Sequence, residues 1–138
     1  MGKQKILYLG NLNAKRDWGH ARDYVIAMWK ILQLKRPDDF VIATGRQYSI
    51  RQFIGFVSKK LNMKIIWKGK GLKEKGYDSV SKRNIISIDK NYMRPLDVNT
   101  LLGNASKARK KLSWKPKINI HQLIDEMISD EVKILDNE

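Results

Sequence analysis

Hydrophobic residues in this chain occur in two patterns: short continuous runs, and stretches in which they recur every three or four positions. The continuous runs are typical of buried strands and predict strands at 5–9, 40–44, 64–68 and 84–89. The helical spacing predicts helices that begin near His20, Ser49, Ser106 and Asn119. This alternation of strands and helices predicts an α/β fold with a small mixed sheet and flanking helices.

Some segments allow a more detailed prediction. Ser49-Ile-Arg-Gln52 has the spacing of a capping box, which predicts that Ser49 caps the second helix. The stretch from Gly69 to Arg83 is rich in Gly and Lys, so we predict a flexible loop there. The acidic tail, residues 130–138, is expected to fray.

Composition limits the class of protein. The chain has 138 residues, which fits one domain, and it has no Cys for disulfides or thiolate metal sites. No apolar run approaches the roughly 18 residues of a membrane span, and no signal peptide precedes the first strand. We therefore expect a cytoplasmic protein without a membrane partner. His20 and His121 have no other ligand residue at metal-binding spacing, so we expect structural roles for both and no metal.

The net charge of +14 has two explanations. Such an excess of Lys and Arg can attract a polyanion such as nucleic acid. Alternatively, it is a solvated surface with one anion site. The basic residues are scattered over several segments and no nucleic-acid module accompanies them, which disfavours nucleic acid as a partner.

Two arginines lie in short motifs that suit a nucleoside diphosphate. Lys15 and Arg16 lie in a predicted loop just before the first helix, and Arg94 precedes Pro95, which biases Arg94 toward an extended backbone. Guanidinium groups bind phosphate oxygens in pairs, and a carboxylate such as that of Asp97 accepts ribose hydroxyls.

Structural roles remain open for the same residues. Arg16 is also spaced to pair with Asp17 or Asp23, and Arg94 to pair with Asp89 or Asp97. Asp97 is equally placed to cap the following segment.

The arginine motifs belong to a longer ordered set of segments: Arg16–His20, Phe40–Gly45, Lys68–Gly71, Lys73–Gly76, Tyr92–Pro95, Leu101–Gly103 and Ser106–Pro116. This set resembles the C-terminal half of the GDP-mannose 4,6-dehydratases, which are extended short-chain dehydrogenases/reductases. The resemblance implies that residues 1–138 form a single substrate-binding region of a Rossmann-type enzyme, including segments that complete its missing cofactor domain.

The resemblance also assigns binding roles. It implies that Arg16 and Arg94 contact the diphosphate of GDP-mannose, with Lys15 adding charge beside them. Asp97 stands where the family carries Glu, so its contact to the ribose would be shortened by one methylene. Trp18 is a further candidate for lining the nucleotide pocket.

The chemistry of the family has no counterpart in this chain. Family members bind NADP at a Gly-x-x-Gly-x-x-Gly turn and use a Thr, a Glu and a Tyr-x-x-x-Lys pair. The positions four places after each Tyr are instead Leu12, Met28, Gln52, Ser81 and Leu96. The resemblance therefore implies no catalytic or cofactor-binding residue here.

A partner is implied for the same reason. We expect an N-terminal cofactor-binding half, or a homo-oligomer, to cover the helix that begins at His20 and the segment 40–44. A stand-alone basic module that binds nucleotides or nucleic acid, and an inactive remnant, are the alternatives.

Overall fold

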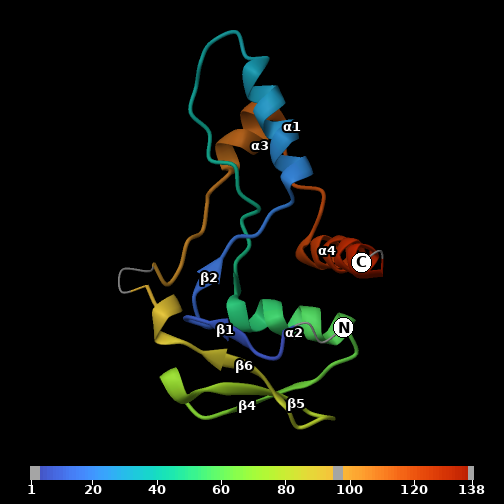
Figure 1. Ribbon diagram of the computed structural model, residues 1–138. Helices are drawn as coiled ribbons and strands as arrows, with labels where there is room; N and C mark the ends of the chain where they lie inside the picture. The colour runs from blue at the N-terminus through green and yellow to red at the C-terminus, as the bar shows by residue number, and fades with distance from the viewer. Residues whose placement is uncertain (1–3, 95–97, 137–138) are drawn as a thin grey trace.

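The computed structural model describes residues 4–94 and 98–136 (Figure 1). Its strands are β1 Leu7–Leu9, β2 Lys15–Arg16, β3 Tyr48–Ser49, β4 Ile65–Lys68, β5 Lys75–Asp78 and β6 Asn84–Ile88. Its helices are α1 Ala21–Leu32, α2 Ile50–Lys60, α3 Ser106–Leu112 and α4 Ile120–Asp136, with short 3-10 helices η1 Gly71–Lys73 and η2 Lys90–Tyr92. The predicted α/β class is confirmed.

The main sheet has the strand order β1-β6-β5-β4 and is mixed. Strand β1 is parallel to β6, whereas β5 is antiparallel to both β4 and β6. Strands β1, β4 and β6 therefore point the same way, and their carboxyl ends share one edge of the sheet. The β4–β5 turn lies at that edge and the β5–β6 turn at the opposite one. The shared edge positions the candidate site.

Helix α2 begins as its sequence predicts. The Ser49 side chain accepts a hydrogen bond from the Gln52 N–H, and the Gln52 side chain accepts one from the Ser49 N–H. Helix α4 begins similarly, because Asn119 Oδ1 accepts from the N–H groups of His121 and Gln122. Helix α4 then continues to Asp136, so the start of the tail expected to fray lies within a helix.

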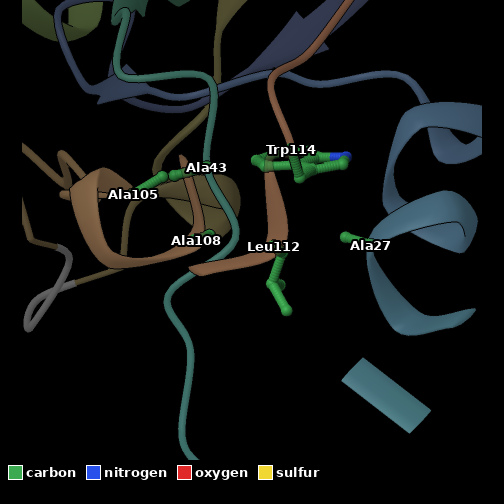
Figure 2. Close-up of a cluster of buried hydrophobic side chains, with 6 residues drawn as sticks. All are labelled: Ala27, Ala43, Ala105, Ala108, Leu112 and Trp114. Carbon is green, nitrogen blue, oxygen red and sulfur yellow. The ribbon is translucent and has the colours of Figure 1, made fainter. Parts of the chain in front are cut away.

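A compact core joins α1, α3 and the extended segment 40–44 (Figure 2). The indole of Trp114 is buried in this core, and its Nε1 donates to the carbonyl oxygen of Asp23 at 2.9 Å. Because this polar atom is satisfied, the ring can be buried without a penalty. The remaining buried members are Ala27, Ala43, Ala105, Ala108 and Leu112.

Three predicted features are wrong. Residues 40–44 are extended but pair with no strand among the described residues. A strand needs a neighbour for its hydrogen bonds, and this segment instead packs against Gly103, where an added Cβ would lie 2.4 Å from the Ala43 Cβ. The predicted loop 69–83 contains β5, an inner strand of the sheet. Lys15 and Arg16 form strand β2 and are not in a loop.

Helix α1 leaves part of its apolar surface uncovered. Its Ala27 side is buried against α3, but Val25, Met28, Trp29 and Leu32 are 60%, 61%, 60% and 80% exposed. The expectation that this chain leaves a helix face uncovered is therefore confirmed. Figure 1 shows α1 and α3 at one end of the molecule and the main sheet at the other.

Candidate functional site

The two arginine motifs lie on neighbouring segments at the shared edge of the sheet. The Asp89 N–H donates to Leu9 O at 2.9 Å, and the Lys15 N–H donates to Asn99 O at 2.8 Å. Between these points, a Cβ on Gly10 would lie 2.1 Å from the Tyr92 carbonyl oxygen, so only glycine permits this approach. Residues 10–16 therefore run beside the segments that flank residues 95–97.

The Arg16 side chain links the first arginine motif to the backbone of Val98, which follows the second motif in the sequence. It lies in β2 opposite Tyr48 of β3, and its Nη1 donates to the carbonyl oxygens of Lys15 and Val98, both at 2.8 Å. The side chain is half-buried. These contacts hold the guanidinium beside the stretch that follows Arg94.

The other three predicted site residues are Arg94, Lys15 and Asp97, and their surroundings differ. Arg94 is exposed just beyond η2, and within residues 4–94 and 98–136 its guanidinium has no hydrogen-bond or ion-pair partner. Lys15 is exposed beside Arg16. Asp97 lies outside the described residues, so its roles as ribose ligand or cap stay predictions.

The two carboxylates considered as partners of Arg16 bind backbone N–H groups. Asp17 accepts from the N–H groups of Thr44 and Gly45 at 3.1 and 2.8 Å, and from the Thr44 hydroxyl at 2.6 Å. Asp23 is buried, and its Oδ2 accepts from the N–H groups of Lys117 and Ile118, both at 2.9 Å. Sequence analysis missed both roles because the partners are distant in the chain.

Tyr24 lies between these two carboxylates. Its hydroxyl packs so closely against Gly19 that an added Cβ would lie 2.1 Å from the oxygen. Burial raises the pKa of Tyr24, and the negative charges of Asp17 and Asp23 raise this pKa further. The phenol therefore stays neutral at ordinary pH and acts as a packing group at the entry to α1.

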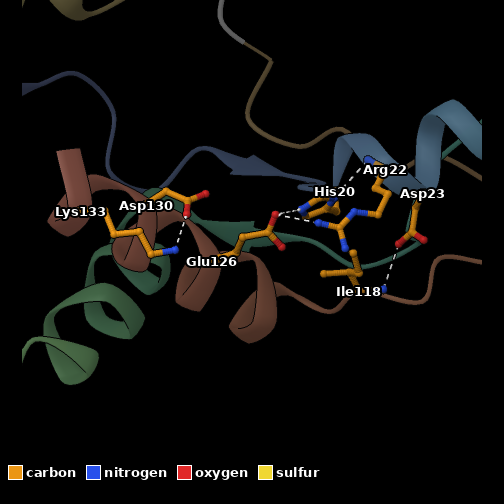
Figure 3. A network of polar contacts seen from close by, with 7 residues as sticks. All are labelled: His20, Arg22, Asp23, Ile118, Glu126, Asp130 and Lys133. Atoms are coloured by element: carbon orange, nitrogen blue, oxygen red, sulfur yellow. Dashed lines mark hydrogen bonds and ion pairs between the residues drawn. The ribbon is translucent and has the colours of Figure 1, made fainter.

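Both histidines have structural roles, as predicted. His20 caps α1, because its Nδ1 accepts from the Arg22 N–H at 3.0 Å (Figure 3). Its Nε2 lies 3.2 Å from Glu126 Oε1, which also accepts from Arg22 Nη2 at 3.0 Å. The His121 ring packs edge-on against Phe56, with the ring centroids 4.7 Å apart.

A separate hollow of about 240 Å³ lies beside Trp18. The Trp18 ring also packs against Phe53, with the centroids 4.9 Å apart. The described lining of the hollow does not include Arg16 or Arg94; it consists of Trp18, Thr44, Arg46, Tyr48 and residues 116–120. Among the described residues, this hollow therefore does not bring Trp18 together with either arginine.

Two other kinds of site are absent from the described part of the chain. No helix there has the length and apolarity needed to cross a membrane. Nor do any three His, Asp or Glu side chains of the described residues gather closely enough to hold a metal ion.

Comparison with known proteins identifies the family. A family model described as GDP-mannose 4,6 dehydratase matches residues 1–127. The chain belongs to the GDP-mannose 4,6-dehydratase family. Among curated relatives, the GDP-mannose 4,6 dehydratase of Dictyostelium discoideum is 47% identical over 136 residues, which are 99% of this chain and 38% of that protein. The GDP-mannose 4,6 dehydratase of Homo sapiens is 42% identical over 135 residues, which are 98% of this chain and 36% of that protein. The chain thus spans little more than a third of the length of these relatives.

Solved structures confirm the predicted fold. RMD from Pseudomonas aeruginosa, complexed with NADPH, matches 93% of this chain and 36% of its own with a TM-score of 0.67 at 19% identity. UDP-glucose 4-epimerase from Thermotoga maritima, with UDP-glucose, matches 94% of this chain and 36% of its own with a TM-score of 0.69 at 18% identity. The fold is that of part of a Rossmann-type extended short-chain dehydrogenase/reductase.

Proposed function

We propose that this chain is the nucleotide-sugar-binding region of a GDP-mannose 4,6-dehydratase, a cytoplasmic lyase that converts GDP-mannose to GDP-4-keto-6-deoxymannose. One observation carries the proposal: in a chain of this family, residues 10–16 and the segments that flank residues 95–97 run side by side at one sheet edge. Two arginines on adjacent segments suit the two phosphates of a nucleoside diphosphate.

Each candidate residue has a separate task in this proposal. Arg94, exposed and without a partner among the described residues, binds one phosphate with two N–H groups of its planar guanidinium. Arg16, oriented by Lys15 O and Val98 O, contacts the second phosphate. Lys15 adds a point charge, and Asp97 accepts a ribose hydroxyl. Fixing the diphosphate in this way would orient the hexose for reaction.

The cofactor of the intact enzyme, NADP, would be held by another half of the protein. The first strand of this chain ends at Leu9, just before Gly10, but the Tyr92 carbonyl oxygen fills the space against Gly10 that a pyrophosphate would need. No glycine fingerprint follows β1. We therefore assign binding and orientation, not redox chemistry, to the residues of this chain.

Calorimetry on a version of the chain joined to a cofactor-binding half tests the proposal. GDP and GDP-mannose should bind more tightly than UDP and its sugars. Arg94→Ala should weaken GDP binding by about 1.5–3 kcal/mol, or roughly 10- to 150-fold in Kd, the scale of charge-assisted hydrogen bonds. Arg83→Ala is the matched control, because Arg83 is an exposed arginine at the opposite edge of the sheet. Equal GDP affinity in wild type and Arg94→Ala would remove Arg94 from the site.

A second experiment tests where the chemistry resides. The isolated chain should neither bind NADP tightly nor form the 4-keto-6-deoxy product. Addition of the portion of the Dictyostelium relative that this chain does not match should restore product formation, measured by mass spectrometry. Product formed by the purified chain alone would contradict the assignment of catalysis to another half.

A further inference from the structure

The β4–β5 hairpin, residues 68–75, presents an uncompensated positive charge. Lys68, Lys70, Lys73 and Lys75 are all exposed, and Glu74 is the only acidic residue among them. No residue in the described ranges forms an ion pair with any of these four ammonium groups. The hairpin thus differs from α3, where Lys107 and Lys111 both pair with Asp38.

Glu74 does not neutralise the four lysines because Arg51 occupies its carboxylate. Arg51 Nη1 and Nη2 donate to Glu74 Oε1 and Oε2 at 2.8 and 3.0 Å. The same guanidinium lies 4.7 Å from the centre of the Trp67 ring. The ion pair is internal to the packing of α2 on the sheet, so the positive charge of the lysines remains at the surface.

The register of the sheet brings two of these lysines together. Lys68 of β4 is directly opposite Lys75 of β5. Like charges at opposed positions of antiparallel strands destabilise a hairpin. The register therefore places two like charges at opposed positions, and the Lys68 Nζ lies 5.4 Å from the centre of the Tyr77 ring, so its charge stays at the surface of the hairpin.

The hairpin lies beside the arginine segments. Its turn is at the sheet edge where β1 and β6 end, and the Ile88 N–H donates to Glu74 O at 3.4 Å. Arg51 Nη2 also reaches Asn13 Oδ1 at 3.5 Å. From Ile88 the chain continues through η2 to Arg94, and from Asn13 it continues to Lys15 and Arg16. Arg51 and Glu74, which form an ion pair with each other, therefore link the lysine hairpin to the segments that lead into both motifs.

We propose that the lysine hairpin is an electrostatic capture surface for the nucleoside diphosphate that binds at the arginine edge. This inference rests on the proposed function. Clustered charge of one sign raises the local concentration of an oppositely charged ligand and its association rate, and salt screens the effect beyond a Debye length of about 8–10 Å. The lysines act before binding, so they change the association rate and its salt dependence while the dissociation rate stays constant.

The test compares two quadruple variants of the full chain by stopped-flow association of a fluorescent GDP, methylanthraniloyl-GDP. One variant replaces Lys68, Lys70, Lys73 and Lys75 with Gln. The control replaces four exposed lysines outside the sheet, Lys35, Lys59, Lys110 and Lys115, with Gln and so removes the same net charge. Far-UV circular dichroism of both variants establishes that they fold as the wild type does.

The hairpin variant should associate about 3- to 10-fold more slowly at low ionic strength, and the difference should fall below about twofold near 0.5 M salt. The control variant should stay within about twofold of wild type throughout, and dissociation rates should be equal. An equal loss in the control would overturn the proposal, because net charge and not the hairpin would be responsible. The proposal would also be overturned if the hairpin variant lost binding to single-stranded RNA while its GDP association stayed unchanged. GDP binding by wild type that does not saturate would overturn both this proposal and the proposed function.

Discussion

At the scale of single residues, two carboxylates fix the geometry that surrounds the candidate arginines. Asp17 follows Arg16 and holds the turn at Thr44 and Gly45, which leads into β3 beside Arg16. Asp23 holds the backbone that enters α4. The sequence motifs identified Arg16 and Arg94, but not these contacts, because a carboxylate's acceptor role depends on which distant N–H groups the fold brings to it.

Asp23→Ala should strongly destabilise the chain. Asp23 is 3% exposed, and its removal leaves the partly buried N–H groups of Lys117 and Ile118 without this acceptor. Each unsatisfied group costs about 1–3 kcal/mol, so the free energy of unfolding should fall by about 2–4 kcal/mol. Urea denaturation measures this change. The control Asp39→Ala alters an exposed loop residue and should cost less than about 0.5 kcal/mol; equal losses would show that Asp23 is not a structural anchor.

At the scale of elements, helices were predictable and some strands were not. The signals that begin α2 and α4 are local, since Ser49 and Asn119 bond to N–H groups within one turn. Strands depend on partners elsewhere in the chain. Residues 40–44 have the composition of a strand but no partner among the described residues, whereas the glycine-containing β5 is paired on both sides. The hydrophobic pattern therefore misassigned residues 40–44, and the Gly- and Lys-rich composition misassigned β5.

The contact between α3 and the loop after α1 should weaken in acid. Hydrogen bonds from Lys107 and then Lys111 hold the pKa of Asp38 well below its usual range. Because the folded-state pKa is lowered, the stabilisation is present above the unfolded pKa, near 4, and is lost as the pH falls through the folded-state value.

The melting temperature should therefore fall progressively below about pH 4, and Asp38→Asn should reduce that fall. The variant should keep some acid sensitivity, because the Ser81 hydroxyl and N–H lower the pKa of Asp78 in the same direction. Asp39→Asn, which alters the neighbouring exposed carboxylate, serves as the control. Identical pH profiles for wild type and Asp38→Asn would show that this ion pair does not stabilise the fold.

At the scale of the whole molecule, the site could be predicted only in part. The resemblance to the family identified the two arginine motifs, and the fold brings their segments to one sheet edge. The lysine hairpin beside them could not be predicted from the sequence, because the Gly- and Lys-rich composition of residues 69–83 predicts a loop. Only the register Lys68–Lys75 and the strand order show that its charges converge there.

The uncovered face of α1 has a consequence for the isolated chain. Burial of a large apolar side chain contributes about 1.5–3 kcal/mol, and Val25, Met28, Trp29 and Leu32 are each 60–80% exposed. Losing several such burials approaches the 5–15 kcal/mol stability of an ordinary domain. Large exposed apolar patches also promote association. We therefore expect a broad, concentration-dependent thermal transition and self-association.

Sedimentation and dye binding test this expectation with a matched pair of variants. Val25→Lys with Leu32→Lys should shift the chain toward monomer and reduce dye binding, because both positions lie on the exposed face of α1. The control, Leu72→Lys with Val80→Lys, alters exposed apolar residues in the turns of the sheet and should leave self-association unchanged. Co-expression with a cofactor-binding half should suppress association of the wild type, since that half would cover the α1 face. A sharp transition from a wild-type monomer, independent of concentration and without dye binding, would mean that this chain folds autonomously and that the exposed α1 face needs no partner.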